Sequence, residues 1–414
     1  MATKGNNPGL NAFIIDEDQA AIELMSAVLK EAGYIVSAYQ DSAAALTDIV
    51  EQKPDCVATN LMMPGLDGLA LCKEIRGNAD LDSTKILVVS SKSYDLDRKR
   101  AFEFGADGYM TKPLNAENFL DQINRIIEDK IDVRFWGVRG TLPVPGDGSL
   151  RYGGNTSCVT MEFPRGQFFI FDGGSGIKAL SDWLMAQKRQ RIQAQIFISH
   201  PHWDHINALP FFVPLYVQGN SFDFYGASHG DLSTENLISA QMDGVYFPIT
   251  IHEFGANVNF HDLREEEVEV RDIPIKTMLL SHPGYCLGYR IDYHGRSICY
   301  VTDNELFPVD SEFHDPAYLN KLIQFVQGAD VLITDATYTD KEYQTKIGWG
   351  HSRISEVVDL AHRADVKNLY LFHHDPDQTD DDIDAKFMTA KNLLAEVNSK
   401  TICHAPAAPT RIQV

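Results

Sequence analysis

The chain has 414 residues, more than one ordinary domain holds, so we expect two or three domains. Apolar residues make up 44% of it, which is enough to build buried cores. The formal net charge of −22 argues against a generic nucleic-acid-binding surface, because phosphate would be repelled at long range.

The cysteines indicate a reducing compartment. There are six of them, scattered and without a Cys-x-x-Cys pair, which is typical of packed thiols in a cytoplasmic protein. Residues 1–9 are polar and lack the apolar segment of a signal peptide. No apolar run approaches membrane-spanning length, so we expect a cytoplasmic protein with no membrane partner.

Residues 9–130 alternate between strand and helix patterns, which predicts a parallel five-stranded sheet with helices on both faces. We expect strands at 12–15, 36–39, 56–59, 86–89 and 108–110, with helices at 19–32 and 43–52. Ligands of such sheets bind at the carboxyl ends of the strands. The polar residues at those ends are Asp16, Glu17, Asn60, Ser90 and Lys112.

This set, together with Tyr109 and the loop 63–68, resembles the receiver domain of response regulators, a flavodoxin-like fold. The phosphoacceptor aspartate of that family falls at Asn60, and an amide forms no acyl phosphate. We therefore expect a pseudo-receiver that docks a signalling protein or self-associates. Asp16, Glu17 and Lys112 are left as a weak cation pocket, and a degenerate scaffold without a signalling role is the alternative.

Residues 131–414 form the second predicted domain, joined to the first by the short charged segment 128–130. An apolar strand at 168–171 ends in Asp172-Gly173-Gly174, which from these residues alone is more typical of a plain turn than of a functional site.

The segment His200-Pro201-His202-Trp203-Asp204-His205 holds three imidazoles and a carboxylate. A strand is predicted before it at 195–198, and the start of a helix after it at 206–212. Imidazole and carboxylate are ligands of zinc, and also of manganese or iron. The spacing predicts two divalent metal ions, with zinc preferred.

Three further ligand-type residues follow predicted strands. His282 follows the strand 275–280, Asp303 follows 297–302, and His373 follows 368–372. His374 is the alternative to His373 as the third of these ligand-type residues, and we prefer His373 because it directly follows its strand. Each lies at a carboxyl strand end, as His200 does.

The order His-x-His-x-Asp-His, His, Asp, His resembles the metallo-β-lactamase superfamily, which implies an αββα sandwich. By that resemblance His200, His202 and His282 hold one metal, and Asp204, His205 and His373 hold the other. The resemblance also implies that Asp303 bridges the two metals and that Asp172 supports the ligands from behind.

The runs 287–291, 334–338 and 350–352 resemble the phosphodiesterase branch that includes tRNase Z and cyclic-phosphate diesterases. The resemblance gives His351 a phosphate contact and a proton to donate, although a place beside a helix cap is its plain alternative. Asp204 would also orient the nucleophile. The insertion 219–255 carries aromatic residues that wall a pocket or simply pack: Phe222, Phe224, Tyr225, Tyr246 and Phe247.

We therefore expect a binuclear metal-dependent hydrolase, a phosphodiesterase acting on a small linear or cyclic diester. The acidic charge and the lack of a basic arm rich in glycine and proline disfavour a nucleic-acid polymer as substrate. The alternatives are a thioester or lactam hydrolase of the same fold, and a non-enzymatic metal-containing sensor or adaptor in a signalling pathway.

Overall fold

The structure, a computed structural model, describes residues 9–187, 191–245 and 247–414. The chain divides into two compact units. The first is Met1–Asp132 with Glu162–Gln167 and Gln187–Arg191, and the second is Val133–Met161, Phe168–Ala186 and Ile192–Val414. The predicted domain ranges 9–130 and 131–414 stay a prediction. No helix within the described ranges is long and apolar enough to cross a membrane.

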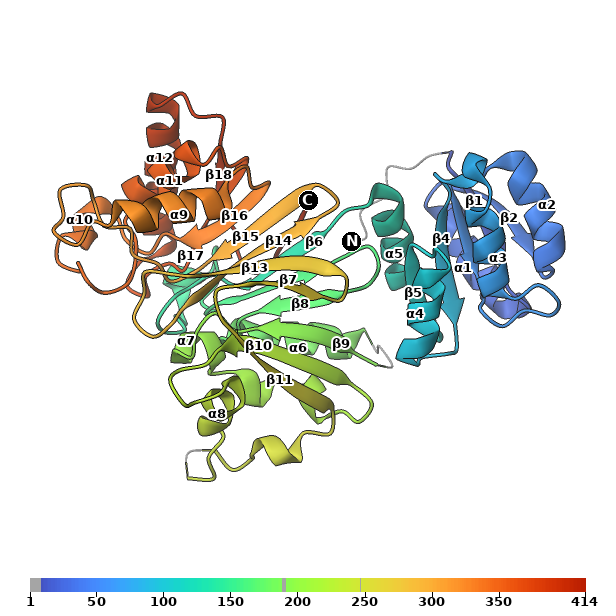
Figure 1. The fold of residues 1–414 in the computed structure, drawn as a ribbon, viewed down its shortest axis with the longest axis horizontal. Coiled ribbons are helices and arrows are strands. Elements are labelled where there is room, and N and C mark those ends of the chain that lie inside the picture. The colour runs from blue at the N-terminus through green and yellow to red at the C-terminus, as the bar shows by residue number, and fades with distance from the viewer. Residues whose placement is uncertain (1–8, 188–190, 246) are drawn as a thin grey trace. The chain divides into compact units, whose positions relative to one another are not determined.

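The first unit contains a five-stranded sheet among its described residues, in the order β2-β1-β3-β4-β5 (Figure 1). All of its neighbouring strands are parallel, and one buried cluster packs on each face, so the predicted flavodoxin-like fold is confirmed. Its strands are β1 Asn11–Ile15, β2 Ile35–Tyr39, β3 Cys56–Thr59, β4 Lys85–Ser90 and β5 Gly108–Thr111. Its helices are α1 Gln19–Glu31, α2 Ser42–Gln52, α3 Gly68–Arg76, α4 Asp95–Glu103 and α5 Ala116–Glu128.

Side-chain caps fix where most of these helices begin. Asp18, Asp41, Asp67 and Asn115 each accept a hydrogen bond from a backbone N–H of the first turn. These N–H groups have no partner inside the helix, so a carboxylate or amide oxygen at the N-cap stabilises the start.

The second unit contains two seven-stranded sheets in the part of the chain that the structure describes. Their orders are β11-β10-β9-β8-β7-β6-β19 and β12-β13-β14-β15-β16-β17-β18. The first sheet is built from β6 Asp132–Gly137, β7 Cys158–Glu162, β8 Phe168–Phe171, β9 Gln193–Phe197, β10 Ser221–Ala227, β11 Asn257–Leu263 and β19 Thr410–Gln413. The second is built from β12 Glu267–Val270, β13 Ile273–Leu279, β14 Leu287–Tyr293, β15 Arg296–Val301, β16 Val331–Asp335, β17 Asn368–Phe372 and β18 Ile402–His404.

Aromatic side chains join the two sheets. Phe171 of β8 lies 5.7 Å from Tyr289 and 5.3 Å from Tyr300 between ring centroids, and Phe135 of β6 stacks on Tyr370 at 5.5 Å. Helices cover the outer faces through two further buried clusters, so the predicted αββα sandwich is confirmed. The helices of the second unit are α6 Gly176–Ala186, α7 Trp203–Ile206, α8 Thr234–Ala240, α9 Pro316–Val326, α10 Asp340–Tyr343, α11 Ile354–Arg363 and α12 Asp380–Glu396.

The helix predicted at 206–212 is wrong. Helix α7 begins at Trp203 and ends at Ile206, and two short 3-10 turns follow it at Leu209–Phe211 and Val213–Tyr216. Pro210 and Pro214 cause the difference, because proline offers no N–H to an α-helical ladder. Asp204 and His205 therefore lie inside the first helical turn.

The aromatic residues of the insertion mostly pack. Phe222 and Phe224 of β10 are fully buried, and Tyr225 stacks on Phe197 with ring centroids 5.0 Å apart. Phe247 packs edge-on against Phe211 at 5.3 Å. Tyr246 lies outside the described residues. Packing is thus the role that the structure gives to the described members of this set.

Candidate metal centre

Strand register brings the predicted ligand residues to one edge of the sandwich. In the second sheet, Val301 of β15 pairs with Thr334 of β16, and Asp335 of β16 pairs with Phe372 of β17. Parallel strands in this register end side by side, so the residues that follow them meet. The first sheet does the same where β8 and β9 pair in parallel. The residues delivered to this edge are Asp172, His200, His202, Asp204, His205, His282, Asp303, Asp335 and His373.

One group of four has ligand atoms that all lie within 4.8 Å of one another: His200, His202, His282 and Asp303. His202 Nδ1 lies 2.9 Å from His200 Nε2 and 3.1 Å from His282 Nε2. Asp303 Oδ2 lies 3.5 Å from the same nitrogen of His200. Three imidazole nitrogens and one carboxylate oxygen thus face a common point.

A second group shares the same spacing and the same aspartate: Asp204, His205, Asp303 and His373. Asp303 Oδ1 lies 3.1 Å from both His205 Nε2 and His373 Nε2. Asp204 Oδ2 lies 3.2 Å and 3.0 Å from these two nitrogens. The two oxygens of Asp303 therefore face different groups, which is the arrangement that a bridging carboxylate needs.

Hydrogen bonds from Nδ1 of His205 and His282 orient these rings so that Nε2 of each faces the other ligand-type residues of its group. His205 Nδ1 donates to Asp172 at 2.7 Å, and His282 Nδ1 donates to the Gly350 carbonyl at 2.8 Å. Each ring then keeps the lone pair of Nε2 for the inner side, as metal-binding histidines do. The donor set therefore fits divalent metal ions.

The charges of the two groups also suit cations. Burial lowers the pKa of His200 well below its usual value, and burial lowers the pKa of His202 and His282 too, so these rings favour the neutral form that binds metal. Burial alone would lower the pKa of His205, but the carboxylates around it, Asp303 first, raise it well above its usual value. The same carboxylates would attract a metal cation at this point.

Asp172 lies behind His205 of the second group, and the supporting role that the resemblance implies for it stays a prediction. Its fully buried carboxylate accepts from Ser199 N at 2.7 Å, Ser199 Oγ at 2.9 Å, His205 Nδ1 at 2.7 Å and the Tyr300 hydroxyl at 2.7 Å. Its backbone lies in the left-handed region, with φ of 60°. This conformation costs free energy in a non-glycine residue and is common at functional sites.

His351 lies beside both groups, with ring centroids 4.9 Å from His373 and 5.3 Å from His282. Its Nδ1 donates to Asp335 Oδ2 at 2.7 Å, so Nε2 is the atom left for a bound molecule. Burial would lower the pKa of His351, but Asp335 outweighs it and raises that pKa to about 9.

Asp335 was missed in the sequence-based site, although it ends a strand as Asp303 and His373 do. It meets His351 and His373 in a third group with metal-ligand spacing. Its carboxylate also accepts from Asn304 N, Thr337 N and Thr337 Oγ1 at 3.1, 2.9 and 2.7 Å. With its lone pairs used this way, Asp335 is better suited to orient His351 than to bind a metal.

The adjacent histidines diverge just beyond the end of β17, where the backbone of His373 is left-handed with φ of 59°. His373 joins the second group, while His374 is fully buried away from it, next to Arg139 and Lys386, whose charges together with burial lower its pKa. A Cβ on Gly140 would lie 2.1 Å from the His373 ring, so only glycine fits there. The geometry agrees with the preference for His373, and the ligand roles themselves stay a prediction.

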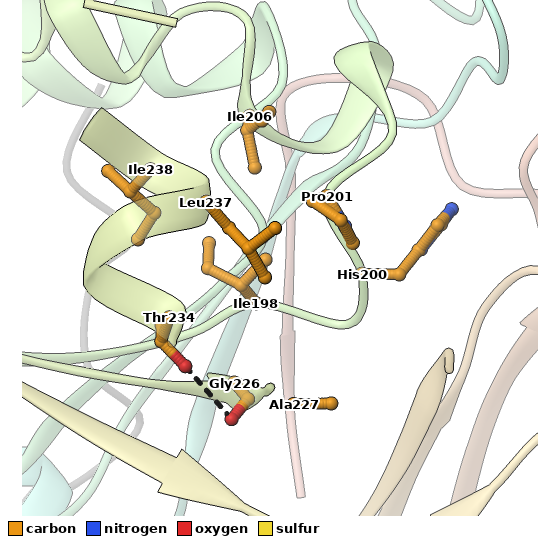
Figure 2. Close-up of a pocket in the computed structure, with 9 residues that line it drawn as sticks. All are labelled: Ile198, His200, Pro201, Ile206, Gly226, Ala227, Thr234, Leu237 and Ile238. Carbon is orange, nitrogen blue, oxygen red and sulfur yellow. Dashed lines mark hydrogen bonds between the residues drawn. The ribbon is translucent and has the colours of Figure 1, made fainter. Parts of the chain in front are cut away.

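A small apolar pocket lies behind the 198–206 segment (Figure 2). Its lining comes from that segment, from the end of β10 and from α8, namely Ile198, His200, Pro201, Ile206, Gly226, Ala227, Thr234, Leu237 and Ile238. Figure 2 shows the His200 ring pointing away from the apolar side chains. The pocket therefore borders the first group through His200.

The receiver pocket is closed by internal bonds. Lys112 Nζ lies 2.7 Å from Asp16, and Asn60 Nδ2 donates to both oxygens of Glu17 at 2.9 and 2.7 Å. Burial raises the pKa of Asp16 despite this lysine. Ser90 is buried at the end of β4, and its hydroxyl accepts from Lys92 N at 3.2 Å. The amide of Asn60 thus takes up the carboxylate that a cation would use.

Known families match both parts of the chain. The Response regulator receiver domain family matches residues 12–124, and the Beta-lactamase superfamily domain matches residues 170–374. The chain is therefore a receiver domain fused to a metallo-β-lactamase-fold domain, as the sequence motifs indicated.

Individual proteins resemble one part each. The response regulator MprA of Mycobacterium sp. (strain KMS) is 33% identical over 115 residues, which are 28% of this chain and 49% of MprA. The chain thus spans about half the length of the curated relatives it matches. The metallo-beta-lactamase fold protein YhfI from Bacillus subtilis is 17% identical, with a TM-score of 0.51, covering 69% of this chain and 100% of YhfI. Human tRNase Z, short form, is 21% identical, with a TM-score of 0.43, covering 59% of this chain and 92% of that chain.

Proposed function

We propose that this chain is a binuclear metal-dependent phosphodiesterase acting on a small linear or cyclic diester. One metal ion would be held by His200, His202 and His282, the other by Asp204, His205 and His373, with Asp303 shared. Zinc suits this nitrogen-rich set best, and manganese or iron suits it next. Divalent ions held there supply Lewis-acid chemistry, in which they activate water and neutralise charge on phosphate oxygens.

The observation that carries this proposal is the His351–Asp335 pair beside both groups. Asp335 holds Nδ1 of His351, so Nε2 can donate a proton to the leaving oxygen of an ester. Phosphodiesters of alkoxides need such a donor, because an alkoxide is a poor leaving group. Asp204, hydrogen-bonded by Thr141 N at 2.7 Å as well as facing His205, would orient the attacking nucleophile.

Exposed aromatic side chains support a small organic substrate. Trp203, Tyr285 and Trp349 are 79%, 57% and 60% exposed, and they stand one to three residues from His202, His282 and His351 in the chain. Large exposed aromatics are uncommon on protein surfaces and often contact apolar or planar groups of ligands. The net charge of −22 disfavours a polyanion.

For the receiver unit we propose a docking or self-association role in signalling, because Asn60 cannot carry a phosphoryl group. A cytoplasmic location belongs to the same proposal and rests on the six cysteines, all of them free and buried.

The test is hydrolysis of bis(p-nitrophenyl) phosphate by full-length protein loaded with zinc or manganese. We expect turnover that is lost in His202→Ala and retained in the exposed control His252→Ala. His351→Ala should slow diesters with poor leaving groups most. Turnover of thioesters or lactams alone, unaffected by His351→Ala, would favour the other hydrolase class, and metal binding without any turnover would favour a sensor.

A further inference from the structure

Glu305 is a buried carboxylate outside the predicted ligand set. It is 2% exposed and lies two residues after Asp303. Its Oε1 accepts from the Tyr343 hydroxyl and from Gly348 N, each at 2.7 Å, and its Oε2 accepts from Gly350 N at 2.7 Å. Both oxygens thus bind the 343–350 loop.

The held loop contacts the candidate centre at two points. The Gly350 carbonyl accepts from His282 Nδ1 at 2.8 Å, and His351 follows Gly350 directly. A Cβ on Gly350 would lie 2.3 Å from the His282 ring, and Gly350 has φ of 86°, so its backbone lies tight against that ring. A shift of this glycine would therefore move both histidines.

The other side of Glu305 is equally fixed. Its backbone N–H donates to the Ser281 carbonyl at 2.8 Å, next to His282. The preceding Asn304 accepts from Ser281 N at 3.1 Å through its side chain. The segment 303–305 therefore links the shared aspartate, the loop of His282 and the loop of His351.

From these contacts we infer that Glu305 is a positioning residue that sets the orientation of His282 and His351 through the 343–350 loop. This inference rests on the proposed function for its effect on catalysis. Its structural half, the anchoring of Gly348 and Gly350, stands on the hydrogen bonds alone.

The variant Glu305→Gln tests the inference with little change of shape. Both carboxylate oxygens accept N–H or O–H donors, so the amide nitrogen must face a donor and at least one bond is lost. Hydrogen exchange on the zinc-loaded full chain should show the Gly348 or Gly350 amide exchanging on the order of tenfold faster. The exposed control Glu312→Gln should leave both amides unchanged.

Kinetics give the second readout. Glu305→Gln should slow the hydrolysis of diphenyl phosphate more than that of bis(p-nitrophenyl) phosphate, because nitrophenolate leaves without a proton. The same pattern is expected for His351→Ala. Glu305→Asp keeps both acceptor oxygens, so its rates should fall between those of the wild type and those of Glu305→Gln. It replaces the glutamine variant if that variant does not fold. Unchanged exchange of both amides, or equal slowing of both esters, overturns the inference. A wild type that hydrolyses neither ester refutes the proposed function instead, and the exchange result still decides the anchoring.

Discussion

Replacing Asp172 by asparagine is the sharpest perturbation of the candidate metal centre. The carboxylate is fully buried and accepts four hydrogen bonds, one of them from His205. Asparagine has the same shape and tolerates the left-handed backbone at φ of 60°, so Asp172→Asn changes charge and hydrogen bonding without adding strain.

The expected cost follows from those bonds. The amide nitrogen must face at least one donor, and an unpaired buried donor costs about 1–3 kcal/mol. The other three bonds lose charge assistance worth about 1 kcal/mol each, while removal of a buried charge offsets part of this. We expect the free energy of unfolding to fall by about 3 kcal/mol. Residues that hydrogen-bond to metal ligands typically contribute 10–100-fold to metal affinity. We therefore expect Asp172→Asn to weaken zinc binding at the site of His205 by about that factor.

The assay is zinc competition against a chromophoric chelator, with urea unfolding of the same samples. Asp182→Asn, at an exposed position paired with Lys178, is the matched control and should change neither quantity. Wild-type zinc affinity together with wild-type stability in Asp172→Asn would refute the assignment of His205 to a metal site.

Three further predictions concern other parts of the chain. Asn60→Asp replaces the amide that binds Glu17 by a further carboxylate, so the receiver's Mg²⁺ affinity in isothermal titration should rise on the order of tenfold; an unchanged affinity would contradict the closed pocket. Burial lowers the pKa of Lys386 from 10.5 to about 7, so the folded state binds fewer protons than the unfolded state between these values and stability rises with pH. Lys386→Met should remove about 1 kcal/mol of that rise between pH 7 and 8 in urea unfolding, whereas the exposed control Lys391→Met should retain it. Removing bound metal with a chelator should lower the melting temperature of the metallo-β-lactamase-fold unit by about 10 °C, since ligand at 1,000 times its dissociation constant contributes about 4 kcal/mol; an unshifted transition would mean that metal binds elsewhere or not at all.

The ligand-type residues were predictable because each one follows an apolar strand. His200, Asp303 and His373 all stand at carboxyl strand ends, and that position alone predicts convergence in a parallel sheet. The same rule applies to Asp335, which belongs to the run 334–338 that was noted for its resemblance but was not named as a site residue. Its contact with His351 is seen only in the structure, as a hydrogen bond between residues 16 positions apart in the chain.

Other parts depended on contacts that sequence does not encode locally. The role inferred for Glu305 comes from bonds to residues 38 to 45 positions away in the chain. The helix at 206–212 was mispredicted because its apolar pattern was weighed above Pro210 and Pro214. Those prolines lie at the starts of two short 3-10 turns, and Asp204 and His205 lie in the separate short helix α7 before them.

The two sheets of the sandwich each carry an incomplete set of candidate ligands. The first sheet supplies residues 200–205, and the second supplies His282, Asp303 and His373. A metal ion held by both would act as a non-covalent cross-link, so its binding free energy would also hold the halves together. A chain cut between β11 and β12, near residue 265, would then reassemble from its fragments more tightly with zinc than without it.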